Sequence, residues 1–490
     1  MSARRVIMRA VLGPVLLLAA TSIPAGAQLD TLWTRTCGGA GADGARAAIC
    51  AGDGGFLLAG YTYSIGAGNV DVYLVKTDSA GFPVWTRAYG GSGRDFGLAA
   101  CAAADGGYLV AGHTSSTGAG KLDAYLVKVD AGGEEVWSRT YGGAEDDEAW
   151  AVCPADGGGF LVAGRTESFG AGESDVYVLA IDAHGDARWA RTYGGTQGDV
   201  ATACCRTSDG GYAVGGFTGS VSANRDMWLL KLDAQGDSLW SVCEGASTNA
   251  DWGWALCPTT SGGVAIAGSG DAHGTYFQQA YVACFDAAGN PQWSDHYGLG
   301  AYYDYGWSIC PLGEGGFLVA GATKDPLTRE NDVTVLRLDA AGQELWSGSF
   351  GGAGSEWGAA VAEISPGNYM VAGQTESRGA GRFDTWLLRL HDPQAGSSPP
   401  SGELVPGCLR FEANPFHDRA VMRYALAEPM NVRLEIVDPS GRRLATLING
   451  SRPAGEHRIA WNAREAEAGA YYGVLVAGEG RSAAKAIRIR

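Results

Sequence analysis

The chain has 490 residues, including 77 glycines and 15 tryptophans, and 53 acidic against 36 basic residues give a formal net charge of −17. No three-residue glycine period runs through it, which excludes a collagen helix, and the 46% hydrophobic content excludes a disordered low-complexity chain. The acidic balance argues against nucleic acid as a partner. A chain of this length is expected to contain more than one domain.

The first 27 residues have the layout of an export signal. Three arginines precede an apolar run from Ala10 to Ala20, and residues 25–27 (Ala-Gly-Ala) offer the small side chains that a signal peptidase accepts. We therefore expect residues 1–27 to be a signal peptide. No later stretch of about 18 apolar residues follows, so no transmembrane segment is predicted in the mature chain.

A long repeat occupies the next part of the chain. Seven tryptophans mark it, separated by 52, 52, 52, 51, 53 and 53 residues: Trp33, Trp85, Trp137, Trp189, Trp240, Trp293 and Trp346. Each period holds four short apolar or alternating segments, for example 96–102, 107–113, 123–130 and 136–141. Four strands per repeat are typical of propeller blades. Residues 28–393 therefore predict an all-β, seven-bladed β-propeller.

The two ends of the repeat array are incomplete. The first tryptophan segment, Leu29–Gly39, has no strands before it, and the last repeat ends at 385–391 without its tryptophan strand. We expect the N-terminal strand to become the outer strand of the last blade, because this closes the ring and leaves few exposed edges.

Turn residues recur in every repeat. The first hairpin reads Asp-Gly-Gly at 53–55, 105–107 and 209–211, and the last reads Asp-x-x-Gly at 78–81, 130–133 and 339–342. Glycine supplies the positive φ of such tight turns. We interpret these aspartates as turn formers and not as catalysts.

Cysteines recur in the first strand of each repeat: Cys50, Cys101, Cys153, Cys205, Cys257 and Cys310. The residues on the cysteine face are small, whereas the other face carries bulky residues such as Trp252, Trp254, Tyr305 and Trp307. We expect the cysteines to be small buried residues and the bulky face to help neighbouring blades pack as wedges. The pairing of the 11 cysteines is not predicted.

Acidic residues recur at two positions of the loop-rich face. One precedes the recurrent cysteine: Asp43, Asp95, Asp147, Asp199, Asp251, Asp304 and Glu356. The other opens the third strand: Asp71, Asp123, Asp175, Asp226, Asp332 and Asp384, with Ala280 as the exception. The first set is a candidate metal site, since carboxylates can hold Ca²⁺ or attract a cationic ligand. In the alternative interpretation each carboxylate accepts hydrogen bonds from its Gly-rich loop.

Loops that depart from the repeat supply the candidate ligand site. Most blades carry Thr-x-Ser-x-Gly-Ala-Gly, as at 62–68 and 114–120, which we interpret as loop geometry. Blades five and six carry longer or different loops with Tyr276, Phe277, Tyr302 and Tyr303. Exposed aromatic rings beside carboxylates suit sugar stacking or a protein partner, although aromatic filling of a longer loop is the alternative.

The C-terminal part loses the repeat. Residues 394–406 form a Gly/Ser/Pro-rich linker, and residues 407–490 show about seven strand-like runs, which predict a small immunoglobulin-like β-sandwich. Residues 28–402 hold 20 basic and 43 acidic residues, a balance of −23, so the acidity belongs to the predicted propeller.

Several motifs give this C-terminal part a family resemblance: Asn414-Pro415-Phe416, Asp438-Pro-Ser-Gly441-Arg442, residues 455–462, Gly469-Ala-Tyr471-Tyr472 and the terminal 485–490. They resemble the FlgD-type immunoglobulin-like domain and the type IX secretion C-terminal sorting domain, although Asn462 stands where the first pattern usually has aspartate. The resemblance implies translocation across an outer membrane, followed by release or surface attachment, with the domain acting as an address.

The function predicted from the sequence is a secreted or cell-surface binding module of a Gram-negative-type bacterium. Its partners would be an extracellular glycan or protein and, through the C-terminal domain, the secretion machinery. No HExxH, P-loop or Gly-x-Ser-x-Gly motif occurs, so no catalytic residue is assigned. The alternative is an extracellular polysaccharide-active or quinoprotein-like enzyme that uses acidic channel residues.

Overall fold

The computed structural model describes residues 29–221, 224–245, 250–271, 278–298, 303–324, 330–393, 395, 409–411, 416–426, 429–438, 442–464, 466, 469–477 and 480–488. Apart from one 3₁₀ turn at Asp156–Gly158, every regular element in these ranges is a β-strand, so the predicted all-β class is confirmed. The predicted signal peptide and nearly all of the predicted linker lie outside them. In the described ranges no helix is long and apolar enough to cross a membrane.

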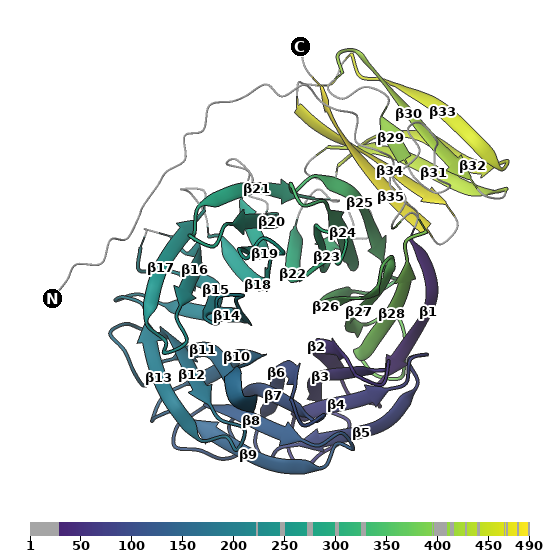
Figure 1. Ribbon diagram of the computed structural model, residues 1–490. Helices are drawn as coiled ribbons and strands as arrows, with labels where there is room; N and C mark the ends of the chain where they lie inside the picture. The colour runs from purple at the N-terminus through teal and green to yellow at the C-terminus, as the bar shows by residue number, and fades with distance from the viewer. Residues whose placement is uncertain are drawn as a thin grey trace.

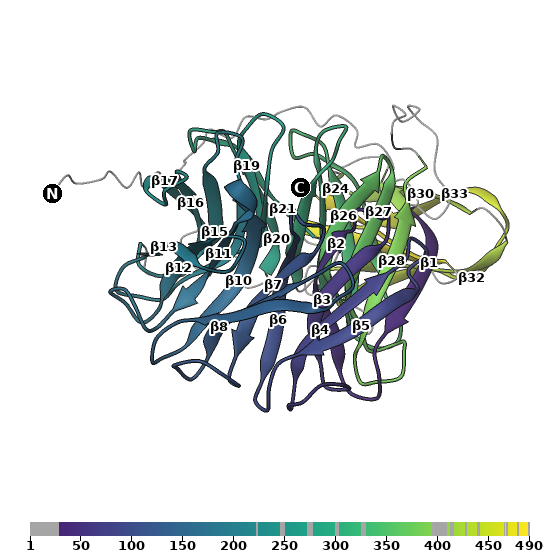
Figure 2. The same cartoon turned by 60° about the horizontal axis from the view of Figure 1, so that its bottom comes forward.

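The strands form eight four-stranded antiparallel sheets and one three-stranded sheet. Seven of the four-stranded sheets contain β1 to β28 and follow one another around a ring (Figure 1), which is consistent with a propeller. Figure 2 shows the same ring tilted, with its sheets side by side.

The innermost strands surround the central opening in Figure 1: β2 (Asp43–Cys50), β6 (Asp95–Ala102), β10 (Asp147–Pro154), β14 (Asp199–Arg206), β18 (Trp252–Pro258), β22 (Asp304–Pro311) and β26 (Glu356–Ser365). The second strands are β3 (Phe56–Thr62), β7 (Tyr108–Thr114), β11 (Phe160–Thr166), β15 (Tyr212–Thr218), β19 (Val264–Asp271), β23 (Phe317–Lys324) and β27 (Asn368–Thr375).

The third strands are β4 (Asp71–Thr77), β8 (Asp123–Val129), β12 (Asp175–Ile181), β16 (Asp226–Leu232), β20 (Gln278–Phe285), β24 (Asn331–Leu338) and β28 (Asp384–His391). The outermost strands are β5 (Pro83–Tyr89), β9 (Glu135–Tyr141), β13 (Ala187–Tyr193), β17 (Ser238–Glu244), β21 (Pro291–Tyr297), β25 (Glu344–Phe350) and β1 (Asp30–Cys37).

The core lies between neighbouring sheets. All residues of β3 and β4 are buried, and Leu57 and Leu74 of these strands pack in one cluster with Val110 and Val127 of the next sheet. Complete burial of such a side chain contributes about 1.5–3 kcal/mol. The near-continuous apolar runs of the middle strands therefore stack the sheets into a ring.

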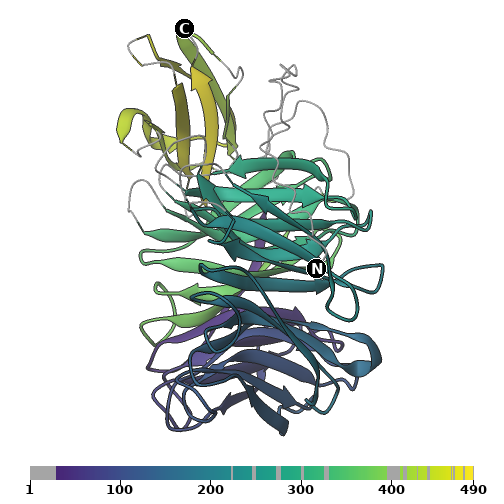
Figure 3. The ribbon, with the colours of Figure 1, turned by 90° about the vertical axis from the view of Figure 1, so that its left-hand side faces the viewer.

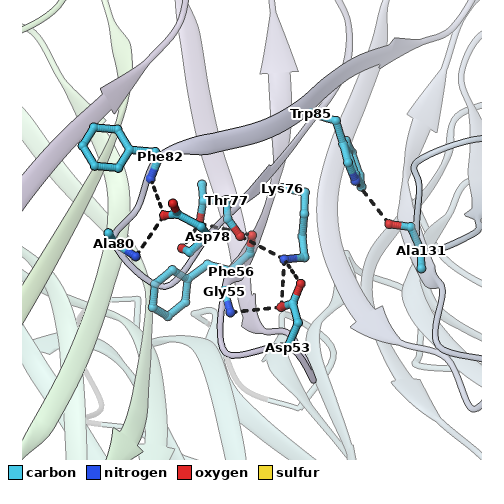
Figure 4. A network of polar contacts seen from close by, with 10 residues as sticks. All are labelled: Asp53, Gly55, Phe56, Lys76, Thr77, Asp78, Ala80, Phe82, Trp85 and Ala131. Atoms are coloured by element: carbon cyan, nitrogen blue, oxygen red, sulfur yellow. Dashed lines mark hydrogen bonds and ion pairs between the residues drawn. The ribbon is translucent and has the colours of Figure 1, made fainter.

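The repeated tryptophan connects each outermost strand to the next sheet. The Trp85 indole N–H donates to the Ala131 carbonyl at 3.2 Å (Figure 4). Trp137, Trp240 and Trp293 make the same contact with Ala183, Ala287 and Ala340. The indole confines the turn glycine that lies beside it. Gly133 has φ +81°, and an added Cβ would lie 2.9 Å from the Trp85 side chain.

The Asp-Gly-Gly hairpin is stabilised by its own aspartate. Asp53 accepts a hydrogen bond from the Gly55 N–H at 3.0 Å and pairs with the buried Lys76 ammonium at 2.7 Å (Figure 4). The side chain of Asp53 is exposed and that of Lys76 is not. These contacts support the interpretation of this residue as a turn former.

The N-terminal strand closes the ring as predicted, because β1 pairs with β28 in the order β1-β28-β27-β26. A backbone hydrogen bond from Asp43 N–H to Phe383 O, at 2.7 Å, spans the closure. It repeats the bond from Asp95 N–H to Val70 O, at 2.9 Å, between two sheets that are consecutive in the chain.

The C-terminal strands form two sheets beside the β22–β25 edge of the ring (Figure 3). One contains β29 (Leu409–Phe411), β30 (Arg419–Leu426) and β33 (Gly455–Asn462), and the other contains β32 (Arg443–Arg452), β31 (Met430–Val437), β34 (Gly469–Ala477) and β35 (Gly480–Arg488). Their shared core includes Trp461 and Tyr471. Val437, Tyr472 and Val474 are buried in a separate cluster.

Candidate functional site

The seven predicted ring carboxylates occupy equivalent positions in the seven sheets of the ring and are all buried. Asp95 accepts hydrogen bonds from the Thr114 hydroxyl, from the Ser116 hydroxyl at 2.7 Å and from the Gly91 N–H at 2.8 Å. Matching hydroxyl and glycine N–H contacts reach Asp43, Asp199 and Glu356. The structure therefore supports the hydrogen-bonding interpretation of this ring.

The carboxylate at the second acidic position accepts hydrogen bonds from the backbone of the same loop. The Ala119 and Gly120 N–H groups of one Gly-Ala-Gly segment donate to Asp123 at 3.3 and 3.0 Å. In the Thr-x-Ser-x-Gly-Ala-Gly motif, the hydroxyls thus serve the first carboxylate and the N–H groups serve the second. In the part of the chain that the structure describes, no group of three or more His, Cys, Asp or Glu side chains could hold a metal ion. The Ca²⁺ site stays a prediction.

Of the four predicted ligand-site aromatics, Tyr276, Phe277 and Tyr302 lie outside the described residues. Tyr303 is described and stands just before β22. Its ring stacks on Tyr305 with centroids 6.4 Å apart and an interplanar angle of 8°, and Tyr305 stacks on Trp307 at 5.3 Å and 16°. The predicted loop aromatic is thus the first ring of a ladder that continues along an innermost strand.

A second ladder lies on the neighbouring innermost strand β18. Trp252 and Trp254 stack with centroids 5.7 Å apart and an interplanar angle of 6°. The rings of Phe217 and Trp252 meet in a T-shaped arrangement with centroids 4.4 Å apart. The Arg225 guanidinium lies 5.3 Å from the Trp252 ring centroid. β18 and β22 are adjacent in the ring (Figure 1), so the two ladders stand on neighbouring strands.

These ladders bear out in part the expectation that the bulky face packs between blades, because Trp252 and Trp254 meet the ring of Phe217, which belongs to the preceding sheet. Their five rings are only partly buried and stack along their own strands. The small face also makes a close contact between sheets, because a Cβ on Gly97 would lie 2.8 Å from Gly60 O of the preceding sheet. The alternating Tyr303, Tyr305 and Trp307 were visible in the sequence, but alternation alone does not show which face meets a neighbour.

A polar cluster that the sequence reasoning missed lies across two other sheets. Glu148 is buried and accepts bonds from Arg165 and from the Trp150 indole N–H, both at 2.7 Å. The His113 Nδ1 lies 4.0 Å from the Glu148 carboxylate, and its ring lies against the Phe96 ring with centroids 5.1 Å apart and an interplanar angle of 36°. Burial lowers the pKa of His113 and Arg165 opposes its protonation, whereas Glu148 favours it.

Among the described residues, one contact between the C-terminal strands and the ring lies where the acidic pattern is broken. Ala280 replaces the second carboxylate there and lines a cavity of about 20 Å³ together with Asp304 and Tyr305, enough for one water molecule. Tyr472 of β34 comes close to Asp304 and is hydrogen-bonded to Gln279. A residue of the C-terminal part therefore reaches the edge of the predicted ligand site.

Most of the recurrent cysteines are shielded from solvent. Four of the six are buried as predicted: Cys101, Cys153, Cys205 and Cys257. Cys310 is only partly buried and Cys50 is exposed, so the prediction of burial is wrong for Cys50. Burial raises the pKa of the Cys101, Cys205 and Cys257 thiols, which disfavours the nucleophilic thiolate. Adjacent Cys204 and Cys205 belong to different core clusters, as expected for opposite faces of a strand.

Comparison with known proteins gives partial similarities. No family model matches the chain. The regulatory protein FlaEY of Caulobacter vibrioides is 32% identical over 114 residues, which cover 21% of this chain and 12% of FlaEY. The chain thus spans about an eighth of the length of this curated relative.

Solved structures resemble the chain at low identity. PorZ, a surface component of the type-IX secretion system of Porphyromonas gingivalis, is 14% identical with a TM-score of 0.40, covering 89% of this chain and 58% of PorZ. A protein of unknown function from Dyadobacter fermentans is 12% identical with a TM-score of 0.42, covering 74% and 99% of the two chains. Sqt1 from Chaetomium thermophilum is 13% identical with a TM-score of 0.44, covering 80% and 97%.

Proposed function

We propose that this chain is an exported binding module built on a seven-bladed β-propeller. In this proposal residues 1–27 are the signal peptide, residues 28–393 the propeller, 394–406 the linker and 407–490 an immunoglobulin-like sorting or attachment domain. The seven sheets formed by β1 to β28 supply one blade each, and the two C-terminal sheets supply the sandwich. The mature protein acts outside the cell or on the cell surface.

The observation that carries the binding function is the ladder of Tyr303, Tyr305 and Trp307. Three nearly parallel rings remain partly exposed on the innermost strand β22 and directly before it, although the same chain buries Trp386 and Tyr369 completely elsewhere. Aromatic rings held in fixed positions at an accessible edge are typical of ligand and partner sites. The ligand classes that fit are an extracellular glycan and a protein segment.

The recurrence of the carboxylates is not by itself an argument for catalysis, because they accept hydrogen bonds from loop hydroxyls and N–H groups in several sheets. A residue that stabilises the same loop in several repeats serves the fold. We therefore infer a binding role for the chain, with the enzyme as the competing function.

Binding and turnover can be separated in one set of measurements. The purified full chain is applied to a glycan array and to immobilised extracellular proteins in a Ca²⁺ buffer, and its products on a polysaccharide panel and its quinone-dependent dye reduction are assayed in parallel. The proposal expects saturable binding that Tyr303→Ala weakens, without turnover. Turnover that disappears on substitution of one ring carboxylate would establish the enzyme instead.

A further inference from the structure

We infer that Cys153 and Cys204 form a disulfide between two neighbouring sheets of the ring when the chain meets a disulfide oxidant. Cys153 lies on β10, the innermost strand of the β10–β13 sheet, and Cys204 lies on β14, the innermost strand of the β14–β17 sheet. The inference rests on the proposed export only for the place where the oxidant is met, because disulfides form and persist outside the cytoplasm.

Each innermost strand directs two consecutive residues toward opposite neighbours. The residue six positions after the ring carboxylate packs toward the next sheet, and the residue five positions after it packs toward the preceding sheet. At four boundaries between sheets, a cysteine in the first position therefore shares a core cluster with an aliphatic residue in the second: Cys101 with Val152, Cys205 with Leu256, Cys257 with Ile309 and Cys310 with Val361.

The boundary between β10 and β14 departs from this pattern, because Cys204 stands in the aliphatic position. Cys204 packs against the core cluster that contains Cys153, and its thiol is hydrogen-bonded to the Cys153 thiol. The Cys204 sulfur also lies 3.8 Å from the carbonyl oxygen of Leu161, the residue of β11 that pairs with Cys153. These contacts bring the two thiols together across the boundary. Of the seven sheet boundaries in the ring, this is the one with cysteine in both positions.

The adjacent Cys205 is the competing partner for Cys204, and the strand geometry argues against it. Cys204 pairs with Val214 and Cys205 with Ala213 in a continuous register. Consecutive side chains of such a strand point to opposite faces, and Cys205 belongs to a different core cluster, on the side of β18. A disulfide between the two adjacent residues would have to disrupt this register, whereas Cys153 already contacts Cys204.

The oxidation is a thiol–disulfide exchange with a diffusible or protein disulfide as the oxidant. Cys204 is partly exposed and Cys153 is buried, so the Cys204 thiolate attacks one sulfur of the oxidant, breaks its S–S bond and releases one thiolate. The Cys153 thiolate then attacks the Cys204 sulfur of the mixed disulfide and releases the second thiolate. The two cysteines lose two electrons, which reduce the oxidant, and their two protons pass to the released thiolates.

The surroundings of the two thiols determine how fast this exchange runs. The hydrogen bond with Cys153, and then burial, raise the pKa of the Cys204 thiol well above its ordinary value. Because the thiolate is the attacking species, oxidation of the folded chain should be slow at neutral pH and faster at higher pH.

The disulfide should stabilise the ring. Cys153 and Cys204 are 51 residues apart in the chain, and a cross-link over such a distance restricts the unfolded chain more than the folded one. Reduction should therefore lower the unfolding temperature by about 3–6 °C.

The test uses the full chain, purified in reductant, freed of it and left with glutathione disulfide at pH 8.5 until its thiol content is constant. Remaining thiols are alkylated in denaturant, and tryptic peptides are analysed by mass spectrometry without reduction. Trypsin leaves Cys153 in residues 140–165 and both Cys204 and Cys205 in residues 192–206. We expect these two peptides to be joined and to separate on reduction.

Two variants identify the cysteine of residues 192–206 that forms the link. Cys204→Val introduces the residue that the preceding sheet has in the same position, Val152, and should remove both the joined peptides and the effect of reduction on the unfolding temperature. Cys205→Ala is the matched control at the adjacent residue and should keep both. The wild-type and Cys205→Ala chains decide the question even if Cys204→Val does not fold.

Three results would overturn the inference: separate peptides 140–165 and 192–206 in the oxidised wild type, a disulfide within residues 192–206, or joined peptides that persist in Cys204→Val. Because the oxidant is added to the purified chain, these results leave the proposed export and binding function standing. Retention of residues 1–27 in the cell or the absence of any bound ligand would count against that function and not against the disulfide.

Discussion

Tyr472 of the C-terminal strand β34 lies beside Asp304, the ring carboxylate that begins β22. Burial raises the pKa of the Tyr472 phenol to about 12, and the nearby Asp304 charge adds to the rise. In other sheets the neighbour of a ring carboxylate is the second carboxylate of the preceding sheet, as with Asp123 and Asp147 around Gly142. Ala280 removes that neighbour here, and the phenol near Asp304 stays neutral and adds no second negative charge.

This relationship predicts that Tyr472→Ala releases the C-terminal part from the ring. Removal of a buried aromatic side chain costs about 3–5 kcal/mol, whereas Tyr472→Phe loses only the hydrogen bond with Gln279, about 1 kcal/mol. Small-angle scattering should show a larger radius of gyration for Tyr472→Ala and no change for Tyr472→Phe.

The adjacent residue gives a matched comparison. Tyr471 belongs to the core of the C-terminal sheets and packs on Trp461 at 5.1 Å. Tyr471→Ala should lower the unfolding temperature of the C-terminal part itself, while Tyr472→Ala should leave its folded circular dichroism intact. Unchanged scattering for Tyr472→Ala would mean that the phenol does not hold the two parts together.

The turn glycines below the tryptophans predict a steric effect that can be measured directly. Gly133 and Gly106 belong to the same sheet, with φ of +81° and +84°. An added Cβ would lie 2.9 Å from the Trp85 ring at Gly133 and would meet nothing within 4 Å at Gly106. Gly106→Ala should cost about 1–2 kcal/mol of backbone strain, and Gly133→Ala should cost more by about 1–3 kcal/mol of overpacking.

Chemical denaturation of the two alanine variants gives the difference in unfolding free energy. Equal losses would show that the indole shifts freely and that the repeated tryptophan does not confine the turn.

The strands were predictable because their pattern repeats. The expected segment 123–130 is strand β8, Asp123–Val129, and the expected 136–141 is β9, Glu135–Tyr141. Spacing and turn residues determine such bounds, since a hairpin turn at Asp130 ends one strand and begins the next. The pairing of β1 with the last sheet was also predictable, because the last repeat lacks one strand and the first tryptophan segment has no strands before it.

The site was less predictable because it depends on contacts between distant segments. The same sequence pattern around Asp95 suits metal binding and loop support, and the sequence does not show that the hydroxyls of Thr114 and Ser116 donate to this carboxylate. The contact between Tyr472 and Gln279 joins two parts with no shared repeat. Sequence periodicity carries no information about such a contact.

The ring carboxylates predict different responses to mutation and to metal removal. Asp95→Asn replaces a buried hydrogen-bond acceptor for Thr114, Ser116 and Gly91 and should cost about 1–3 kcal/mol. If these contacts account for the ring, the unfolding temperature in a chelator should equal that in Ca²⁺. Exposed Asp130→Asn is the control. A marked rise of the unfolding temperature with Ca²⁺, lost in Asp95→Asn, would establish the metal site instead.

His113 predicts a pH dependence of stability below neutrality. Its pKa is lowered in the folded protein, first by burial and then by the Arg165 charge, while Glu148, Asp95 and Asp146 oppose the shift. The unfolded chain therefore binds a proton near the usual histidine pKa of about 6.5 that the folded chain does not accept until lower pH. Above a pH of about 6.5, His113 therefore leaves the free energy of unfolding unaffected. As the pH falls below this value, His113 lowers the free energy of unfolding by at most about 1.4 kcal/mol per pH unit.

Urea denaturation at pH 7.5 and at pH 5.0 measures this loss. His113→Gln should reduce the difference between the two unfolding free energies, because the buried titrating group is gone, whereas the exposed His184→Gln should reproduce the wild-type difference. Glu148→Gln should make the acid loss larger, since the carboxylate that favours the imidazolium is removed. An unchanged pH dependence in His113→Gln would show that other groups, and not this imidazole, control stability at the inner edge of the ring.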